Sequence, residues 1–194
     1  QNVDGIILIP QDGETATTIV AEAQDADVPI AVFNRPPSDL SKGIVVVADN
    51  ATIAGQAVDS VVEKALAAKP EGKLNAIIVV GDLGDPNAVG RKDGFYASIE
   101  KHKDRFDVTE VASNWDAATA LSNLEAAVTA KPQVDLLFTS SDFLWPTIRS
   151  VFEPRGLWKK TGEDGHVWMA GLDGDATACQ LIKEGWIDAT GVQD

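Results

Sequence analysis

Residues 79–95 read VVGDLGDPNAVGRKDGF, which places a glycine-rich turn between an apolar run and the start of a helix. Such strand–turn–helix units are the building blocks of α/β folds. The turn matches no phosphate-binding motif, because Gly90 is followed by arginine and lysine rather than by lysine and a hydroxyl residue. Asp82 and Asp85 would also repel a phosphate group. The stretch therefore predicts an α/β protein whose turn serves a neutral or cationic ligand.

The composition of the 194 residues is that of one large or two small globular domains, with 44% hydrophobic and 24% charged residues. The formal net charge of −14, without a basic stripe, argues against binding to nucleic acid or to anionic membranes. No apolar run approaches the roughly 20 residues that a membrane span needs. The single cysteine, Cys179, excludes an internal disulfide and is expected in the core. His166 lies in a polar context and is expected at the surface.

Apolar runs bounded by turn residues alternate with helical patterns along the whole chain. This alternation predicts doubly wound parallel sheets covered by helices, with strands that are buried on both faces. The expected strands are Val3–Ile9, Pro29–Phe33, Ile44–Val47, Asn75–Val80, Asp107–Ala112, Val134–Thr139, Val167–Gly171 and Ile187–Val192. The expected helices are Glu14–Ala26, Ala51–Ala68, Pro86–Lys101, Ala117–Ala130, Phe143–Glu153 and Asp175–Glu184.

Polar side chains follow nearly every expected strand, and ligands of open parallel sheets bind beyond the carboxyl ends of the strands. The set contains no histidine, cysteine or lysine, so it offers no evident acid–base or nucleophilic pair. Its planar hydrogen-bonding groups and one indole suit a neutral polyhydroxylated ligand, whose ring can pack on an aromatic face. These residues include Asn34, Arg35, Asp49, Asn50, Asp82, Arg91, Asn114, Trp115, Asp116, Ser141, Asp142, Asp173 and Gln193.

Several of these residues also have a purely structural explanation. Asn50, Asp116 and Asp142 could each cap the helix that follows. Arg91 could form a surface ion pair with a nearby aspartate, and Asp173 could simply form a turn. The residues alone leave these alternatives open.

Segments in one order over essentially the whole chain resemble the ribose/galactose-type periplasmic sugar-binding proteins of ABC transporters. They are VDGIILIP, DVPIAVFNR, VADNATIAGQAV, GRKDGF, SNWDAATAL, KPQVDLLFTSSD and AGLDGDATACQLIKEGWIDATGVQD. Effector domains of LacI-type repressors share this fold and many of these segments. The resemblance implies the two-lobed type I periplasmic-binding-protein fold, in which a hinge closes two α/β lobes on one sugar. It places residues 1–48 in part of the first lobe and residues 49–193 in the second, with the chain truncated at both ends.

The resemblance also implies four contacts to the sugar from the first half of the chain. Asn34 and Arg35 match the pair that holds sugar hydroxyls from the first lobe. Arg91 matches the arginine that precedes the glycine–phenylalanine pair of the helix. Trp115 matches the aromatic residue stacked against the sugar ring.

Four further contacts are implied in the second half of the chain. Ser141 stands where the family usually has asparagine, and the shared Asp142 follows it. Asp173 matches the aspartate that grips two hydroxyls, and Gln193 matches the amide at the second hinge crossing. The segment DFLWPTI departs from the small residues usual after Asp142, and its Pro146 is compatible with a helix only in the first turn.

These expectations predict an extracytoplasmic solute-binding protein, periplasmic or anchored as a lipoprotein, that delivers a monosaccharide to an ABC transporter permease. Its mechanism would be hinge closure around the sugar, without catalysis, cofactor, metal or insertion into the membrane. Two alternatives stay open. One is the sugar-effector domain of a LacI-type repressor, which a helix-turn-helix segment would indicate. The other is an α/β enzyme that uses its aspartates with a metal.

Overall fold

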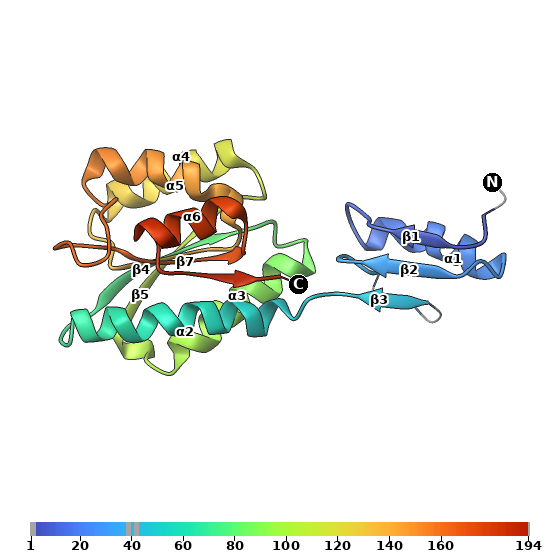
Figure 1. Cartoon of the computed structure of the whole chain (residues 1–194), viewed down its shortest axis with the longest axis horizontal. Helices are drawn as coiled ribbons and strands as arrows, with labels where there is room; N and C mark the ends of the chain where they lie inside the picture. The colour runs from blue at the N-terminus through green and yellow to red at the C-terminus, as the bar shows by residue number, and fades with distance from the viewer. Residues whose placement is uncertain (1–2, 38–39, 41–42, 194) are drawn as a thin grey trace. The chain divides into compact units, whose positions relative to one another are not determined.

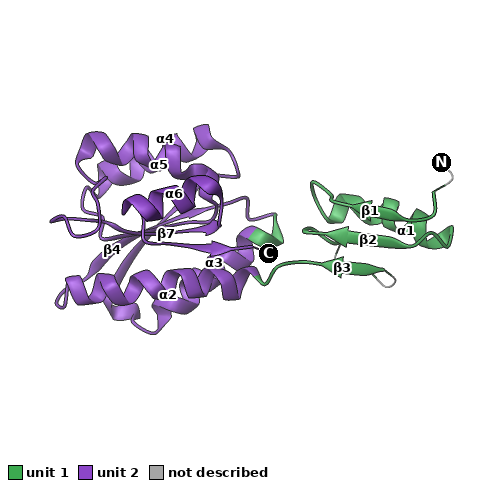
Figure 2. Ribbon diagram, in the orientation of Figure 1, with its two compact units in different colours: residues 1–49, 85–87 green, residues 50–84, 88–194 purple. Residues whose placement is uncertain are grey.

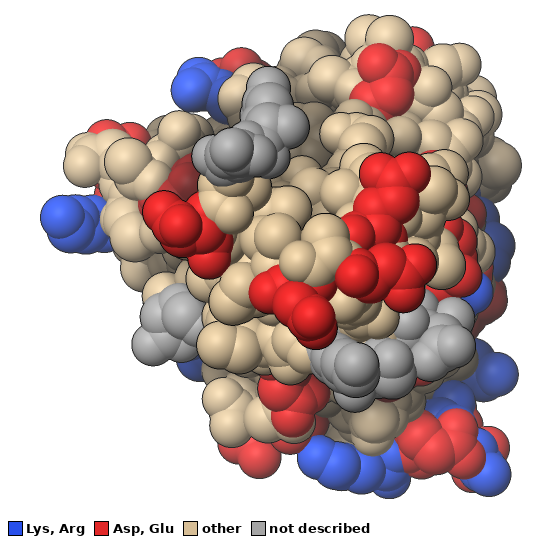
Figure 3. All heavy atoms as spheres, turned by 90° about the vertical axis from the view of Figure 1, so that its right-hand side faces the viewer, with Lys and Arg blue, Asp and Glu red and all other residues tan. Residues whose placement is uncertain are grey.

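The structure is a computed structural model that describes residues 3–37, 40 and 43–193. It divides into two compact units, which Figure 2 shows in different colours. Unit 1 comprises residues 1–49 with 85–87, and unit 2 comprises residues 50–84 with 88–194. Acidic side chains outnumber basic ones on the face drawn in Figure 3, in keeping with the net charge of −14.

Unit 1 is a small parallel sheet with one covering helix (Figure 1). Its strands, in the spatial order β1-β2-β3, are β1 (Ile6–Leu8), β2 (Ile30–Phe33) and β3 (Ile44–Val46). A 3₁₀ turn, η1 (Glu14–Ala16), leads into α1 (Thr17–Asp25). Val20 of α1 packs against Ile30 and Val32, whereas Ile7, whose side chain points to the other face, is 76% exposed. The core of unit 1 thus lies on one face of its sheet.

Unit 2 is built on a five-stranded sheet in the order β5-β4-β6-β7-β8, in which all neighbours are parallel. The strand order reverses at β4, because the chain passes from β4 to β5 on one side and then to β6 on the other. The strands are β4 (Leu74–Val80), β5 (Phe106–Ala112), β6 (Leu136–Thr139), β7 (Trp168–Asp173) and β8 (Ala189–Val192).

Helices cover both faces of this sheet (Figure 1). The helices are α2 (Asn50–Ala68), α3 (Pro86–Glu100), α4 (Ala117–Ala130), α5 (Trp145–Phe152) and α6 (Ala176–Glu184), with 3₁₀ turns η2 (Lys103–Arg105), η3 (Asp142–Leu144) and η4 (Glu153–Arg155). Along β4, Ile77 and Val79 enter the core under α4, α5 and α6, while Ile78 and Val80 enter the core under α2 and α3. This two-sided burial explains why the strand reads as a continuous apolar run.

The expected α/β fold with parallel sheets is confirmed, and each expected strand and helix overlaps an element of the structure. Asp116 caps α4 by accepting a hydrogen bond from the Thr119 backbone N–H, as one of the structural alternatives predicted. The DFLWPTI segment forms η3 and then α5, and Pro146 lies in the first turn of α5, where it breaks no helical hydrogen bond.

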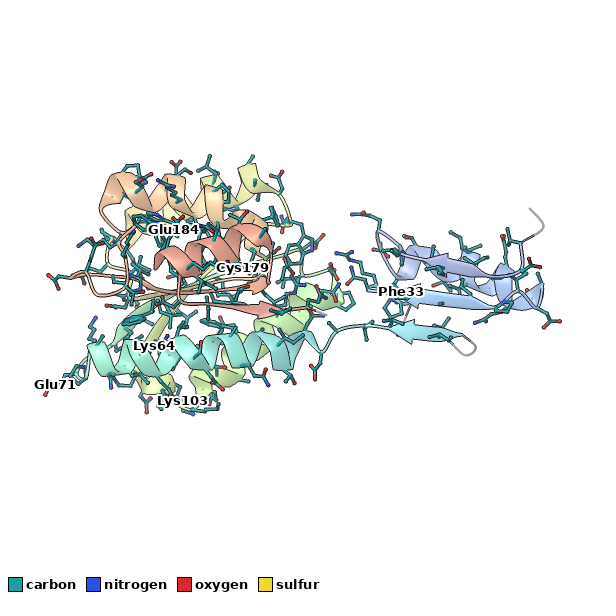
Figure 4. All side chains as sticks on the ribbon, in the orientation of Figure 1. Phe33, Lys64, Glu71, Lys103, Cys179 and Glu184 are labelled. Carbon is teal, nitrogen blue, oxygen red and sulfur yellow. The ribbon has the colours of Figure 1, made fainter. Side chains whose placement is uncertain are left out.

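Two expectations about burial were wrong. Cys179 is exposed on α6 (Figure 4), because its helix turns its apolar residues Leu181 and Ile182 toward the core instead. The His166 side chain is only 4% exposed, because it bonds the carboxylate of Asp188, which is 2% exposed. Within the described residues, no helix combines the length and apolar character that a membrane crossing requires.

Candidate functional site

The candidate site lies at the carboxyl edge of the unit 2 sheet, where the strand order reverses. Crevices at such reversals are the usual binding place of doubly wound sheets, because neighbouring loops diverge there. The loops after β5 and β6, the last residue of β7, the residue after β8 and helix α3 supply most of the side chains predicted to bind a ligand.

Arg91 of α3 is the centre of this site, and only 5% of the residue is exposed. Its Nε donates to Asn50 Oδ1 at 2.8 Å, and its Nη1 donates to the carbonyl oxygen of Ser140 at 2.6 Å. Its Nη2 donates to Gln193 Oε1 at 3.0 Å and lies 3.1 Å from Asp173 Oδ1. A buried guanidinium is costly unless it is paired and hydrogen-bonded, and here it holds together the ends of α2, β6, β7 and β8. The surface ion pair considered for Arg91 is therefore excluded.

Asp173 ends β7 with its side chain 31% exposed. The Ser141 hydroxyl donates to Asp173 Oδ2, so the carboxylate lies between that hydroxyl and the Arg91 guanidinium. The backbone φ of Asp173 is 127°, a conformation that residues with a side chain rarely adopt. Strain of this kind persists where the surrounding structure holds it in place, and it clusters at functional sites. The carboxylate is thus oriented by two neighbours and still accessible to a hydroxyl group.

Trp115 lies in the loop after β5 and is partly exposed. It and the preceding Asn114 both have positive φ values, 56° and 50°. The ring centre lies 5.7 Å from the Cζ atom of Arg91, within the range of a cation–π contact. A Cβ atom on Gly81 would lie 2.2 Å from the indole Cζ2 atom. The glycine of the turn after β4 therefore makes room for an aromatic ring rather than for a phosphate.

Asp142 requires a correction, because it was expected to contact a ligand or to cap a helix. Its side chain has no exposed surface, and its carboxylate accepts hydrogen bonds from Trp145, Gly174, Asp175 and Thr190. Burial raises the pKa of Asp142 above its ordinary value, although these donors act in the opposite direction. With its oxygens directed at protein donors, Asp142 lies behind the site rather than in it.

Asn34 and Arg35 belong to unit 1. Asn34 has a φ of 70°, and its Oδ1 atom accepts a hydrogen bond from Asn87 Nδ2 at 3.0 Å. Arg35 Nε lies 2.7 Å from Asp85 Oδ2. Both side chains are thus fixed at the carboxyl end of β2 by residues of their own unit.

Asn50 is a component of the site that sequence reasoning assigned differently. Sequence analysis placed it among the polar residues after the expected strands, left open that it only caps the following helix, and assigned it no contact to the sugar. In the structure it is the first residue of α2, is 6% exposed and accepts the Arg91 Nε hydrogen bond. The sequence signal was its position after a strand, which it shared with the residues assigned to the site.

Residues 1–194 match the family described as periplasmic binding protein domain. The chain belongs to this family. It is 26% identical over 190 residues to the D-xylose-binding periplasmic protein of Haemophilus influenzae, with 95% of this chain and 54% of that protein covered. The chain thus spans about half the length of the curated relatives that it matches.

Solved structures of the periplasmic binding protein family have the same fold. The chain resembles an ABC transporter periplasmic solute-binding protein of Actinobacillus succinogenes with bound D-allose (TM-score 0.82, 25% identity, 97% of this chain and 65% of that one). It also resembles a solute-binding protein of Bacillus halodurans with bound myo-inositol (TM-score 0.80, 26% identity, 99% of this chain and 63% of that one).

The chemistry available in this periplasmic binding protein domain is that of reversible hydrogen bonding. Carboxylate, guanidinium and amide groups converge beside an indole, which suits a ring that carries several hydroxyl groups. Among residues 3–37, 40 and 43–193, no group of three or more His, Cys, Asp or Glu side chains is arranged to hold a metal ion.

Proposed function

We propose that this chain binds a monosaccharide or a related cyclic polyol at the carboxyl edge of the unit 2 sheet. The observation that carries the proposal is the set of bonds around Arg91, which orients Asp173 and Gln193 beside the partly exposed Trp115 ring. A sugar hydroxyl can donate to the accessible Asp173 carboxylate, which Arg91 holds in place, and the apolar face of the sugar ring can lie on the indole.

Two residues of unit 1 are also proposed to contact a sugar. Asn34 and Arg35 are assigned this role because of the family resemblance, and both are oriented by hydrogen bonds within their unit. Ser141 is assigned an indirect part as well as a direct one, because its hydroxyl already bonds Asp173.

The biological role that we propose is that of an extracytoplasmic solute-binding protein, which delivers its ligand unchanged to an ABC transporter permease. The relatives reported above are named as sugar- or solute-binding proteins, two of them as periplasmic, which favours this role over the effector domain of a repressor. The ligands named for them, D-xylose, D-allose and myo-inositol, are all ring-forming polyols.

A thermal-shift screen tests the proposed function. The protein is melted with D-xylose, D-ribose, D-allose and myo-inositol, with amino acids of similar size as controls. Because a ligand that binds only the native state raises the melting temperature, at least one polyol should raise it for the wild type but not for Asp173→Ala. No shift with any polyol, or equal shifts in both proteins, would contradict the proposal. Recovery of a chemically altered sugar would contradict transport without catalysis.

A further inference from the structure

Trp145, the first residue of α5, is the largest of the fully buried side chains, and 1% of it is exposed. Its Nε1 donates to Asp142 Oδ1 at 2.8 Å. Both groups pack onto Gly171 of β7, where an added Cβ atom would lie 2.1 Å from Asp142 Oδ1 and 2.9 Å from Trp145 Cζ2. The indole and the carboxylate are thus pressed against the strand that ends in Asp173.

The other oxygen of Asp142 holds the turn that follows this strand. Asp142 Oδ2 accepts from the backbone N–H of Gly174 at 2.8 Å, from that of Asp175 at 3.3 Å and from Thr190 Oγ1 at 2.6 Å. Asp173 and Gly174 have φ values of 127° and 73°. One buried carboxylate therefore bonds the end of β7, the start of α6 and β8 at the point where the backbone is strained.

We propose that Trp145 and Asp142 are positioning residues of the candidate ligand site. They hold the turn in which Asp173 has a strained φ and Gly174 follows it, and they thereby set the direction in which the Asp173 carboxylate faces Arg91 and a ligand. The relevance to a sugar rests on the proposed function, whereas the positioning itself is a property of the ligand-free protein.

The physical argument is that this turn needs support from outside itself. Strained backbone conformations persist only where the surrounding structure over-determines them. A carboxylate in a low-dielectric interior binds its donors strongly, and removal of one donor leaves it under-satisfied. The indole N–H on Oδ1 fixes the rotation of this carboxylate, so its loss should let the carboxylate turn and weaken the bonds from Oδ2 to the Gly174 and Asp175 amides.

The test is Trp145→Phe, which keeps an aromatic ring on Gly171 but removes the N–H donor. Its matched control is Trp158→Phe, because Trp158 is also buried, lies in the same core, and has an Nε1 without a hydrogen-bond partner within the described residues. In both variants the exchange of backbone amides and the NMR signals of the Arg91 guanidinium are measured without ligand.

We expect the Gly174 and Asp175 amides to exchange about tenfold faster in Trp145→Phe than in the wild type, and not faster in Trp158→Phe. The Arg91 guanidinium signals should shift only in Trp145→Phe, because Arg91 Nη2 is paired with the Asp173 carboxylate. A role confined to core packing would alter amides near the substituted ring and leave the Arg91 signals in place.

Should Trp145→Phe fail to fold, Thr190→Val supplies the second variant, since it removes another donor to Asp142 with little change of shape. Because the Thr190 hydroxyl also accepts from the Gly174 amide, only the Asp175 amide and the Arg91 signals are compared in this variant. The same two signatures are expected. A folded variant of either kind with wild-type exchange at Asp175 and unshifted Arg91 signals would overturn the positioning role. These readouts need no sugar, so a failed sugar screen would count against the proposed function alone.

Discussion

Arg91 and Asp173 form an ion pair at the carboxyl edge of the unit 2 sheet, with 3.1 Å between Nη2 and Oδ1. The Arg91 side chain is 7% exposed and that of Asp173 is 31% exposed, so one partner is enclosed and the other faces outward. A charge held in this way is oriented before a ligand arrives, which lowers the ordering cost of binding.

Replacement of either partner should weaken sugar binding. We expect Asp173→Ala and Arg91→Ala each to cost about 2–4 kcal/mol of binding free energy, because each leaves a buried polar partner without its bond. Calorimetry with the polyol identified by the thermal-shift screen measures the loss. Asp104→Ala, which removes an exposed carboxylate in η2, is the control and should bind as the wild type does. Unchanged affinity in both site variants would disprove the assignment of the site.

The contact between Gly81 and Trp115 gives a second test. Gly81→Ala should displace the indole, because the new Cβ atom would lie 2.2 Å from it. We expect a loss of about 1–3 kcal/mol in both binding and stability. In a Trp115→Ala background the same substitution should cost almost nothing, since the clash is gone. Gly55→Ala, whose Cβ atom would meet its nearest neighbour at 3.6 Å, is the control. Equal effects of Gly81→Ala in both backgrounds would show that this contact does not matter.

Much of the fold could be predicted from sequence, because β4 and its neighbours are apolar on both faces and are bounded by turn residues and caps. Asp116, for example, was recognisable as a cap of α4 from its place before an alanine-rich helix. The predicted ends of the strands were less accurate. The strand expected at Val3–Ile9 covers only Ile6–Leu8 in the structure, because only the middle of this apolar run pairs with β2.

The site could be predicted only as a set of candidates. Position after a strand selects polar residues but does not say which way a side chain points. Asp142 and Asp173 both follow expected strands, yet the first is buried among four donors, whereas the second pairs with Arg91 and stays 31% exposed. The bond between Asn50 and Arg91 depends on how α2 and α3 pack, and no local sequence pattern records that.

The buried pair of His166 and Asp188 predicts that stability depends on pH. His166 Nδ1 lies 2.8 Å from the Lys159 carbonyl oxygen, and Nε2 lies 3.0 Å from Asp188 Oδ2. Burial acts to lower the pKa of His166, but the bonds to Asp188 and Lys159 and the nearby acidic charges raise it above its ordinary value. Both ring nitrogens therefore donate in the protonated form.

Because the folded pKa is the higher one, protonated His166 stabilises the fold below the ordinary pKa of about 6.5, and this stability is lost as the pH rises through the raised value. Denaturant unfolding from about pH 5.5 to pH 9 should show this decline, and His166→Gln should remove most of it. His102→Gln, at an exposed position, should retain it. A decline of the same size in His166→Gln would rule out this histidine as its source.

Unit 1 should open more readily than unit 2, because its core is smaller. Among the described residues of unit 1, one small hydrophobic cluster lies on one face of the sheet. Its buried members are Val20, Ala23, Ile30 and Val32. On the other face Ile7 is 76% exposed, and Ile44 in β3 is 64% exposed. Each fully buried aliphatic side chain contributes about 1.5–3 kcal/mol, so a sheet covered on one face gains much less than a sheet covered on both.

Amide hydrogen exchange measures this difference in the intact chain. The free energy of opening for β2 should lie at least about 2 kcal/mol below that for β4, whose residues enter the cores on both faces of the unit 2 sheet. Two matched substitutions test whether burial on one face causes this difference. Val32→Ala, at a position with no exposed surface, should speed amide exchange in β2, whereas Ile7→Ala should change the exchange of β2 little. If β2 and β4 open with the same free energy, the two units unfold as one cooperative body and the exposed face of the small sheet carries no penalty.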